Sequence, residues 1–286
     1  MSTAVTVLSY NVSFEAMTNK SNPKFSAAAL GKKCVPTSHN PKLTICAEYM
    51  ARTIDTAATR APGSSLDFVA IQEASRWDEL QKAAVKSLAN MGSFGSIQGY
   101  TEIVTFYDTS KYRLDKKHVD GYNNERPFQI LVLKNVFDTS GTIFINTHNP
   151  HPREMPQNRF NFSDMDTHLS KAITSMNLSD TEKTYRIIIA GDFNETGWYE
   201  ISQNIQRSWT PFSNAGITTT VSIGDPVYSC CKGDGGWKDH STGALAEGHR
   251  GGDYIFDSQA AANIKVPMGY KPLKLQSDHL PVVAVL

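Results

Sequence analysis

The stretch RIIIAGDFNE at residues 186–195 decides the fold class of this chain. Its apolar part is a short run rich in β-branched residues and bounded by polar ones, which is typical of a strand. Asp192 and Asn194 follow directly, so they lie where that strand ends. In open α/β sheets, ligands bind at the rim beyond the strand ends. The stretch therefore predicts a strand of an α/β protein that delivers polar groups to a ligand site.

The same pattern of short apolar runs recurs along the whole chain, and amphipathic segments lie between some of them. Apolar side chains spaced for one face of a helix occur at 43–58, 77–91 and 164–178. This mixture of strands and helices, without an internal repeat, predicts mixed sheets covered by helices in one domain, residues 1–286. The further runs that predict strands are 4–10, 66–72, 102–107, 129–133, 141–148, 253–256 and 280–286.

Polar residues with chemical capability stand at the ends of these predicted strands. Carboxylates supply the hard oxygen ligands that Mg²⁺ prefers, imidazoles transfer protons, and amides orient phosphate groups. One polar strand end means little, but a set of them indicates a shared site. The set comprises Asn11, Gln72, Glu73, His148, Asp192, Asn194, Asp253, Asp278 and His279.

These residues also carry a family resemblance. The sequence resembles the endonuclease/exonuclease/phosphatase superfamily, which has the fold of pancreatic deoxyribonuclease. The resemblance implies a four-layer α/β/β/α sandwich, with two mixed β-sheets flanked by helices. At the position of His148 in NTH, the sequence resembles the deoxyribonuclease-like and sphingomyelinase-like branches of the superfamily. The motifs, in the order of the family, are SYN (9–11), IQEA (71–74), ERPFQILVL (125–133), NTH (146–148), AGDFNE (190–195), GGDYIF (251–256) and SDHLPV (277–282).

The resemblance implies a role for each residue of the set. Glu73, Asn11 and Asp278 are the expected metal ligands, with Mg²⁺ as the expected ion and Mn²⁺ or Ca²⁺ as alternatives. His279 and Asp253 form the expected acid/base pair, because a carboxylate on one ring nitrogen fixes the tautomer of the imidazole.

Further roles concern the phosphate and the water. His148 is expected to stabilise phosphate charge or to protonate the leaving oxygen. Asp192 is expected to orient or deprotonate the attacking water, while Asn194, Asn11 and Arg126 contact the phosphate. Whether His279 or Asp192 activates the water stays open at this point.

These roles imply a divalent-metal-dependent phosphodiesterase that hydrolyses nucleic-acid phosphodiester bonds. DNA and RNA, and endo- and exo-cleavage, stay open. One alternative is a lipid or small-molecule phosphoesterase of the sphingomyelinase or phosphatase kind. Another, of a different class, is a catalytically inactive binding module on the same fold.

Composition restricts the partners. The formal net charge is zero, which argues against a protein that coats nucleic acid by charge alone. No apolar run approaches the length of a membrane span, and we expect a monomer. Two long irregular stretches, the Lys-rich 13–42 and the Gly-rich 229–252, leave their roles open.

The cysteines and the N-terminus bear on localisation. The N-terminus lacks the pattern of a signal peptide, which favours a cytoplasmic or other intracellular protein. The same expectation makes Cys34, Cys46, Cys230 and Cys231 free thiols. A Cys34–Cys46 disulfide in a secreted protein is the alternative.

Overall fold

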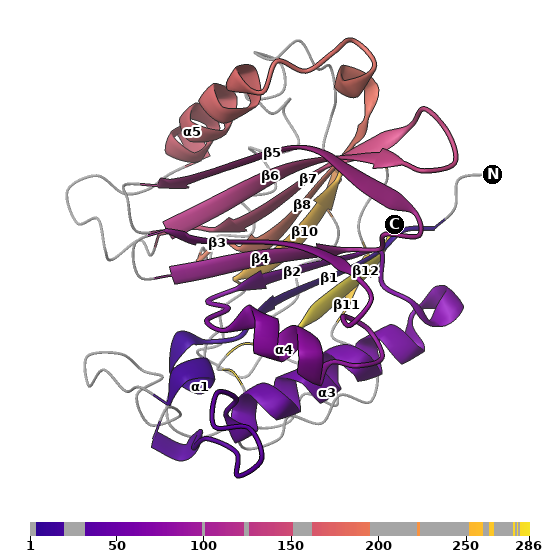
Figure 1. Ribbon diagram of the computed structural model, residues 1–286. Coiled ribbons are helices and arrows are strands. Elements are labelled where there is room, and N and C mark those ends of the chain that lie inside the picture. Colours follow the sequence, from indigo (N-terminus) through magenta and orange to yellow (C-terminus); the bar gives the residue numbers. More distant parts are fainter. Residues whose placement is uncertain are drawn as a thin grey trace.

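Two β-sheets packed face to face form the centre of the computed structural model, and helices cover their outer faces (Figure 1). This arrangement confirms the predicted α/β/β/α sandwich. The structure describes residues 4–19, 32–98, 101–122, 126–150, 162–194, 222–223, 252–259, 263–265, 277, 279 and 281–286.

The first sheet has the strand order β11-β12-β1-β2-β4-β3. β1 and β2 run parallel, whereas the other described neighbours are antiparallel. The strands are β1 (Thr6–Asn11), β2 (Phe68–Gln72), β3 (Gly92–Gln98), β4 (Thr101–Tyr107), β11 (Asn263–Lys265) and β12 (Val282–Val285).

The second sheet has the order β5-β6-β7-β8-β10-β9. Here β7 and β8 are the parallel pair, so each sheet is mixed. The strands are β5 (Tyr112–Tyr122), β6 (Arg126–Asn135), β7 (Gly141–His148), β8 (Arg186–Asp192), β9 (Ser222–Ile223) and β10 (Asp253–Asp257).

Helices cover the outer face of each sheet. Figure 1 shows α5 (Phe162–Ser175) on the second sheet and α1 (Phe14–Thr18), α3 (Ile45–Arg60) and α4 (Trp77–Ala83) on the first. The α3 helix begins where the Thr44 hydroxyl accepts a hydrogen bond from the Ala47 amide, a standard N-cap. It buries Met50 and Ile54, four residues apart, against the sheet. Two short 3-10 turns lie at Pro62–Ser64 and Glu182–Thr184.

Strand alternation divides the buried residues into three layers. On β1, Leu8 and Tyr10 pack toward the helices, whereas Val7 packs toward the other sheet. The layer between the sheets is apolar where Phe68 and Phe144 stack, with ring centroids 4.9 Å apart. Toward the C-terminal ends of β1, β2, β7 and β8 the same alternating positions become polar.

The predicted strands and helices are present, with shifts at their ends. The helix expected over 77–91 stops at Ala83, because the Gln81 amide donates to the carbonyl oxygens of Leu88 and Met91 and holds a tighter turn there. The strands β3 and β5 escaped prediction. β5 is an edge strand whose apolar pattern is broken by the charged run 115–117, and β3 is rich in glycine. A Cβ at Gly95 would lie 2.4 Å from Trp77 Nε1, so only glycine fits there.

The expectation of free thiols is wrong for Cys34 and Cys46, which form a disulfide. The Thr37 amide donates to the Leu43 carbonyl and the Ile45 amide donates to the Val35 carbonyl. This pairing of 35–37 with 43–45 brings the two cysteines opposite each other. Cys230 and Cys231 lie outside the described residues.

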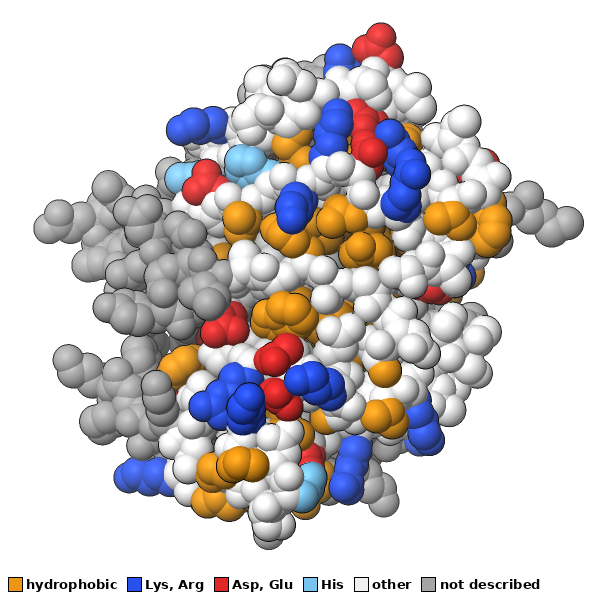
Figure 2. Space-filling model, in the orientation of Figure 1, with side chains coloured by type: hydrophobic (Ala, Val, Ile, Leu, Met, Phe, Trp, Pro, Cys, Tyr) orange, Lys and Arg blue, Asp and Glu red, His pale blue; other side chains and the backbone are white. Residues whose placement is uncertain are grey.

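The distribution of charge on the surface and the lengths of the helices bear on binding to nucleic acid and to membranes. Figure 2 shows an apolar band between the two sheets, with basic and acidic side chains mixed on either side of it, rather than one strongly charged face. Within the ranges described above, no helix is both long and apolar enough to cross a membrane.

Removing the disulfide with Cys34→Ala and Cys46→Ala should lower the free energy of unfolding by about 3 kcal/mol, the loop-entropy value for a closure of this size. Urea denaturation of the variant and of the oxidised wild type measures the difference. Added reductant should destabilise the wild type and leave the variant unchanged. Equal midpoints for the two oxidised proteins would show that the bond contributes nothing.

Candidate active site

The polar strand ends meet at one edge of the sandwich. Parallel pairing places the C-terminal ends of β1 and β2 side by side, with Asn11 opposite Gln72. In the second sheet, His148 at the end of β7 lies opposite Asp192 at the end of β8. Asp253 begins the antiparallel strand β10 and also lies opposite Asp192. The topology therefore gathers residues from both sheets into one place.

Asp192 occupies the centre of this group and is 1% exposed. Its Oδ2 accepts a 2.8 Å hydrogen bond from the Asn11 side-chain amide and lies 3.7 Å from the Nε2 atoms of both His148 and His279. Its Oδ1 accepts from the backbone amide of Asn194 at 2.8 Å. Burial raises the pKa of Asp192, and the neighbouring Asp253 adds to this, while His279, Asn11 and Asn194 act in the opposite direction.

Glu73 reaches the same group from the first sheet. Its Oε2 accepts a 2.7 Å hydrogen bond from the Phe14 amide. Its Oε1 lies 3.5 Å from Arg126 Nη1 and 3.6 Å from His148 Nε2. The Glu73 backbone is left-handed, with φ of 56°, a conformation that costs a non-glycine residue about 1 kcal/mol or more. The fold holds this strained turn directly after β2, where it aims the carboxylate at the second sheet.

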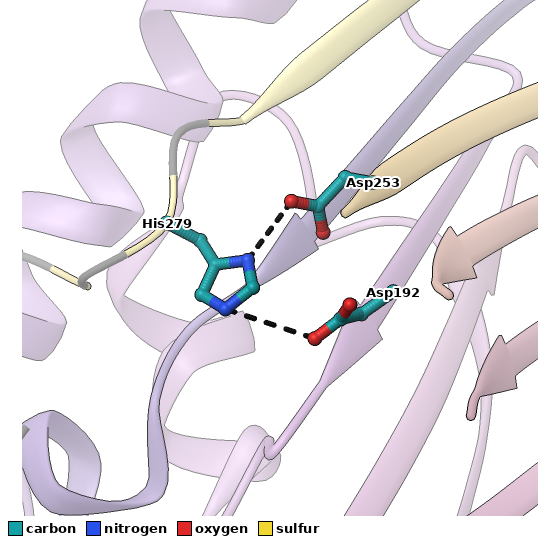
Figure 3. Close-up of side chains that lie close together, drawn as sticks. All are labelled: Asp192, Asp253 and His279. Atoms are coloured by element: carbon teal, nitrogen blue, oxygen red, sulfur yellow. Dashed lines mark hydrogen bonds and ion pairs between the residues drawn. The ribbon is translucent and has the colours of Figure 1, made fainter. Parts of the chain in front are cut away.

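His279 and Asp253 form a buried pair (Figure 3). Asp253 Oδ2 lies 2.9 Å from His279 Nδ1, and the other ring nitrogen points toward Asp192. This contact makes Nδ1 the protonated nitrogen of the neutral ring and leaves Nε2 unprotonated. The arrangement is the one expected of an acid/base pair.

Ser277 anchors His279 and was missed by the sequence reasoning, although it opens the SDHLPV motif. Its hydroxyl donates to the Asn11 carbonyl at 2.6 Å and accepts from the His279 amide at 3.0 Å. Ser277 thus ties the segment of His279 to the end of β1.

Arg126 and His148 lie side by side at the start of β6 and the end of β7. The Arg126 guanidinium contacts His148 Nε2, and the same Nη1 lies near Glu73. The position of Arg126 beside the carboxylates agrees with a group that meets an anionic substrate. Its contact with phosphate stays a prediction.

Asn194 has a left-handed backbone, with φ of 51°, which asparagine tolerates better than most residues. One of its side-chain N–H groups donates to the Asn149 carbonyl at 2.8 Å. The Asn149 amide in turn donates to the Asp192 carbonyl, and its side-chain oxygen accepts from Thr147. Asn149 is a second residue that the sequence reasoning missed. Only its place directly after NTH could have indicated it.

Among the described residues, one group of side chains could hold a metal ion. Ligand atoms of Asp192, Asp253 and His279 lie within 4.8 Å of one another. Glu73 is not a member of this group; its Oε1 lies 3.6 Å from His148 Nε2, which in turn lies 3.7 Å from Asp192 Oδ2. Asn11 presents its nitrogen to Glu73 and Asp192 and its oxygen to the Ser13 amide, so ligation by that oxygen would require the amide to rotate. Asp278 lies outside the described residues.

Comparison with known proteins gives one relative in sequence and several in structure. The sequence matches no family model. It is 31% identical over 293 residues to an uncharacterized protein, L684, of Acanthamoeba polyphaga mimivirus. The match covers 98% of this chain and 50% of that protein, so the chain spans about half the length of the curated relative.

Three solved structures show the fold. An endonuclease/exonuclease/phosphatase protein of Bacteroides vulgatus has a TM-score of 0.56 at 15% identity, covering 99% of this chain and 98% of that one. A mannosyl-6-phosphatase of Bacteroides thetaiotaomicron has a TM-score of 0.58 at 14% identity, covering 99% of both chains. ANGEL2, a 2′,3′-cyclic phosphatase in complex with adenosine-2′,3′-vanadate, has a TM-score of 0.58 at 14% identity, covering 99% of this chain and 95% of that one. The chain thus has the fold of the endonuclease/exonuclease/phosphatase superfamily.

Proposed function

We propose that the protein is a divalent-metal-dependent phosphodiesterase that hydrolyses nucleic-acid phosphodiester bonds. The observation that carries this proposal is the convergence on Asp192 Oδ2 of two imidazoles, at 3.7 Å each, with Glu73 beyond one of them. One imidazole has its tautomer fixed by Asp253, and the other lies beside a guanidinium. Hydrolysis of a phosphoric ester needs such groups: a base for water, a cation-binding carboxylate, and positive charge for the phosphoryl oxygens.

The base is assigned to the pair of His279 and Asp192. Nε2 of His279 is the unprotonated ring nitrogen, and it faces Asp192 across 3.7 Å, a gap that a water molecule can share with both. His279 takes the proton, and Asp253 stabilises the resulting imidazolium. Asp192 orients the water through Oδ2. Because Asp192 is buried and its pKa is raised, it is also able to hold a proton itself.

The phosphate group is assigned to the side of the site away from His279. Arg126 offers a planar guanidinium, which contacts phosphate oxygens in bidentate fashion. His148, beside it and fully buried, donates to a phosphoryl oxygen or protonates the leaving oxygen. Asn194 completes the set with the remaining N–H of its amide.

A divalent cation fits the residues around Glu73. The carboxylate oxygens of Glu73 and Asp192, 3.6 and 3.7 Å from His148 Nε2, are hard donors of the kind that Mg²⁺ prefers, with Mn²⁺ or Ca²⁺ as substitutes. Asn11 and Asp278 complete the proposed ligand set. A bound cation supplies Lewis-acid stabilisation of charge on the phosphoryl oxygens. We keep Asp253 and His279 as the acid/base pair, because their 2.9 Å contact fixes the tautomer of the ring and leaves Nε2 of His279 facing Asp192.

The nucleic-acid substrate draws support from basic residues beside Glu73. Arg76 follows three residues later and donates to the Lys42 carbonyl at 2.8 Å; both side chains are exposed. Lys32 and Lys33 are exposed as well and precede the disulfide that fixes this segment to α3. The structural neighbours carry the names of sugar and nucleotide phosphatases, so the fold by itself leaves the substrate open. Residues 20–31 and 229–251, which include Trp237, lie outside the described part.

A lipid substrate is the alternative function, and one pair of exposed apolar residues bears on it. Val136 and Phe137, 48% and 78% exposed, are an apolar pair at the turn between β6 and β7. That turn lies at the other end of β7 from His148, about 24 Å away at ~3.4 Å per residue. An apolar contact on that side would hold a membrane away from the described site. The observation favours a water-soluble substrate.

The Cys34–Cys46 disulfide supports a proposal about the compartment. Disulfides such as the buried Cys34–Cys46 bond form and persist in oxidising environments. This favours an oxidising compartment over the intracellular location that the sequence suggested. We extend the proposal to a protein that acts as a monomer in one domain and in an oxidising compartment.

Hydrolysis assays with Mg²⁺ or Mn²⁺ test the function directly. Substrates are plasmid DNA, single-stranded RNA, bis(p-nitrophenyl) phosphate and sphingomyelin vesicles. We expect metal-dependent cleavage of a nucleic acid, abolished by EDTA. His279→Ala should reduce kcat by about 10²–10⁴-fold, and Glu73→Gln should abolish the response to metal.

Matched controls come from an exposed ion pair outside the site. His39 and Glu48 lie 2.6 Å apart, so His39→Ala and Glu48→Gln repeat the two changes where no chemistry is assigned. Both should retain wild-type activity. Cleavage of sphingomyelin alone would replace the nuclease with the lipid reading, and inertness on every substrate would favour the binding module.

The buried charge of Asp192 should appear in the pH dependence of stability. With its pKa raised, the folded protein holds a proton that the unfolded chain releases from about pH 4 upward. The free energy of unfolding should therefore fall as the pH rises through this range in the presence of EDTA. Asp192→Asn should lack this part of the fall.

Urea denaturation at a series of pH values measures this effect. Asp180→Asn is the control, because the Asp180 side chain is fully exposed. If Asp192→Asn keeps the full slope of the wild type, the carboxyl of Asp192 is not held at a raised pKa.

A further inference from the structure

The site is assembled from two sheets that share no backbone ladder among the described strands. Every described pairing joins strands of the same sheet. Glu73 and Asn11 come from the first sheet, whereas His148 and Asp192 come from the second. The contact of Glu73 Oε1 with His148 Nε2, at 3.6 Å, therefore depends on how one sheet is registered on the other.

A chain of buried side-chain hydrogen bonds joins the two sheets beneath the site. Gln72 on β2 donates through Nε2 to Asn146 Oδ1 on β7 at 2.8 Å. Asn146 donates back to the first sheet, to the Val104 carbonyl at 2.9 Å and the Thr105 hydroxyl at 3.1 Å. Thr105 donates to Gln129 Oε1 on β6 at 2.9 Å.

The last member returns to the first sheet once more. The Gln129 amide donates to the carbonyl oxygens of Phe94 and Ile103 and to the Ser96 hydroxyl, at 2.9–3.2 Å. Gln72, Thr105, Gln129 and Asn146 are all 0% exposed. We call these four residues the amide chain. It crosses between the sheets three times within the buried layer.

The position of the amide chain links it to the reacting groups. Gln72 immediately precedes Glu73, and Asn146 lies two residues before His148 on the same face of β7. Apolar contacts in this layer, such as Phe68 on Phe144, are non-directional and allow the sheets to slide. Hydrogen bonds between buried amides are directional, and a displaced amide leaves polar atoms without partners at a cost of about 1–3 kcal/mol each.

We infer that Gln72 and Asn146 are positioning residues, which fix the register of the two sheets and thereby the spacing of Glu73 and His148. An active site needs its groups held within about 0.5 Å, and a misplacement of about 1 Å costs about 10²-fold in rate. The inference rests on the proposed function for its kinetic consequence. Its structural consequence, the spacing of Glu73 and His148, stands independently.

The test removes the amide and keeps the volume. Gln72→Met should reduce kcat by about 10- to 100-fold with KM changed less than about threefold, because substrate contacts remain while the two halves lose their alignment. The reciprocal swap of Gln72→Asn with Asn146→Gln retains an amide pair and should recover at least part of the loss. Thr105→Val, a milder change at the middle of the chain, should give a smaller loss of kcat.

Phe144→Leu is the matched control, because Phe144 lies on the same face of β7, two residues before Asn146, and makes only apolar contacts in the layer. It should lower the melting temperature at least as much as Gln72→Met and leave kcat within about twofold. An equal loss of kcat in Phe144→Leu, or wild-type kcat in both Gln72→Met and Thr105→Val, would overturn the inference.

A crystal structure of the Gln72→Met variant, or of Thr105→Val if the first does not fold, separates this inference from the proposed function. A changed distance between Glu73 and His148 supports positioning even if the wild type hydrolyses none of the substrates. An unchanged distance refutes positioning even if the wild type is an active nuclease.

Discussion

A carboxylate buried among other acids is the constraint on which the rest of this site depends. Asp192 is almost completely removed from solvent, and burial disfavours its charged form. Its neighbours offset that cost: Asn11 donates to one oxygen, the Asn194 amide donates to the other, and His279 acts in the same direction. Each neighbour comes from a different segment of the chain, so satisfying one carboxylate brings these segments together. The same arrangement leaves a centre that is able to exchange protons.

The topology explains why those segments can meet. Each sheet contains one parallel pair, β1 with β2 and β7 with β8, and parallel pairing places two C-terminal strand ends at the same edge. Because the two sheets face each other, both edges lie in one layer. Alternation then decides which residues take part, because side chains at every second position enter the space between the sheets. His148 and Asn146 share one face of β7, and Thr147 between them points to the other side, where its hydroxyl meets Tyr122.

Much of this could be read from the sequence, for a physical reason. Apolar runs ending in polar residues mark strands that end at a rim, and this pattern located β1, β2, β7, β8 and β10. The expected pairing of His279 with Asp253 is present in the structure because a histidine at the end of one segment and an aspartate at the start of another meet through strand order. The strand β5 was missed because charged residues, with Arg113, Asp115 and Lys117 exposed at a sheet edge, interrupt its apolar pattern.

Contacts that depend on how distant segments align in three dimensions could not be predicted from the sequence. The letters of IQEA and NTH include Gln72 and Asn146, but nothing in either motif indicates that the two amides meet across 74 residues. Ser277 and Asn149 act through backbone atoms of other segments, which leave no mark in composition. The Cys34–Cys46 disulfide was only the alternative to free thiols for the same reason, since a short backbone pairing between 35–37 and 43–45 decides it.

Anomalous diffraction from crystals soaked in Mn²⁺ locates the cation without reference to activity. We expect one strong peak beside the Glu73 carboxylate, between Glu73 and Asp192, while His279 keeps its contact with Asp253. A peak ligated by His279 together with Asp253 would contradict the assignment of those two residues to proton transfer. The absence of any peak among these carboxylates would contradict the proposal of a metal-dependent enzyme.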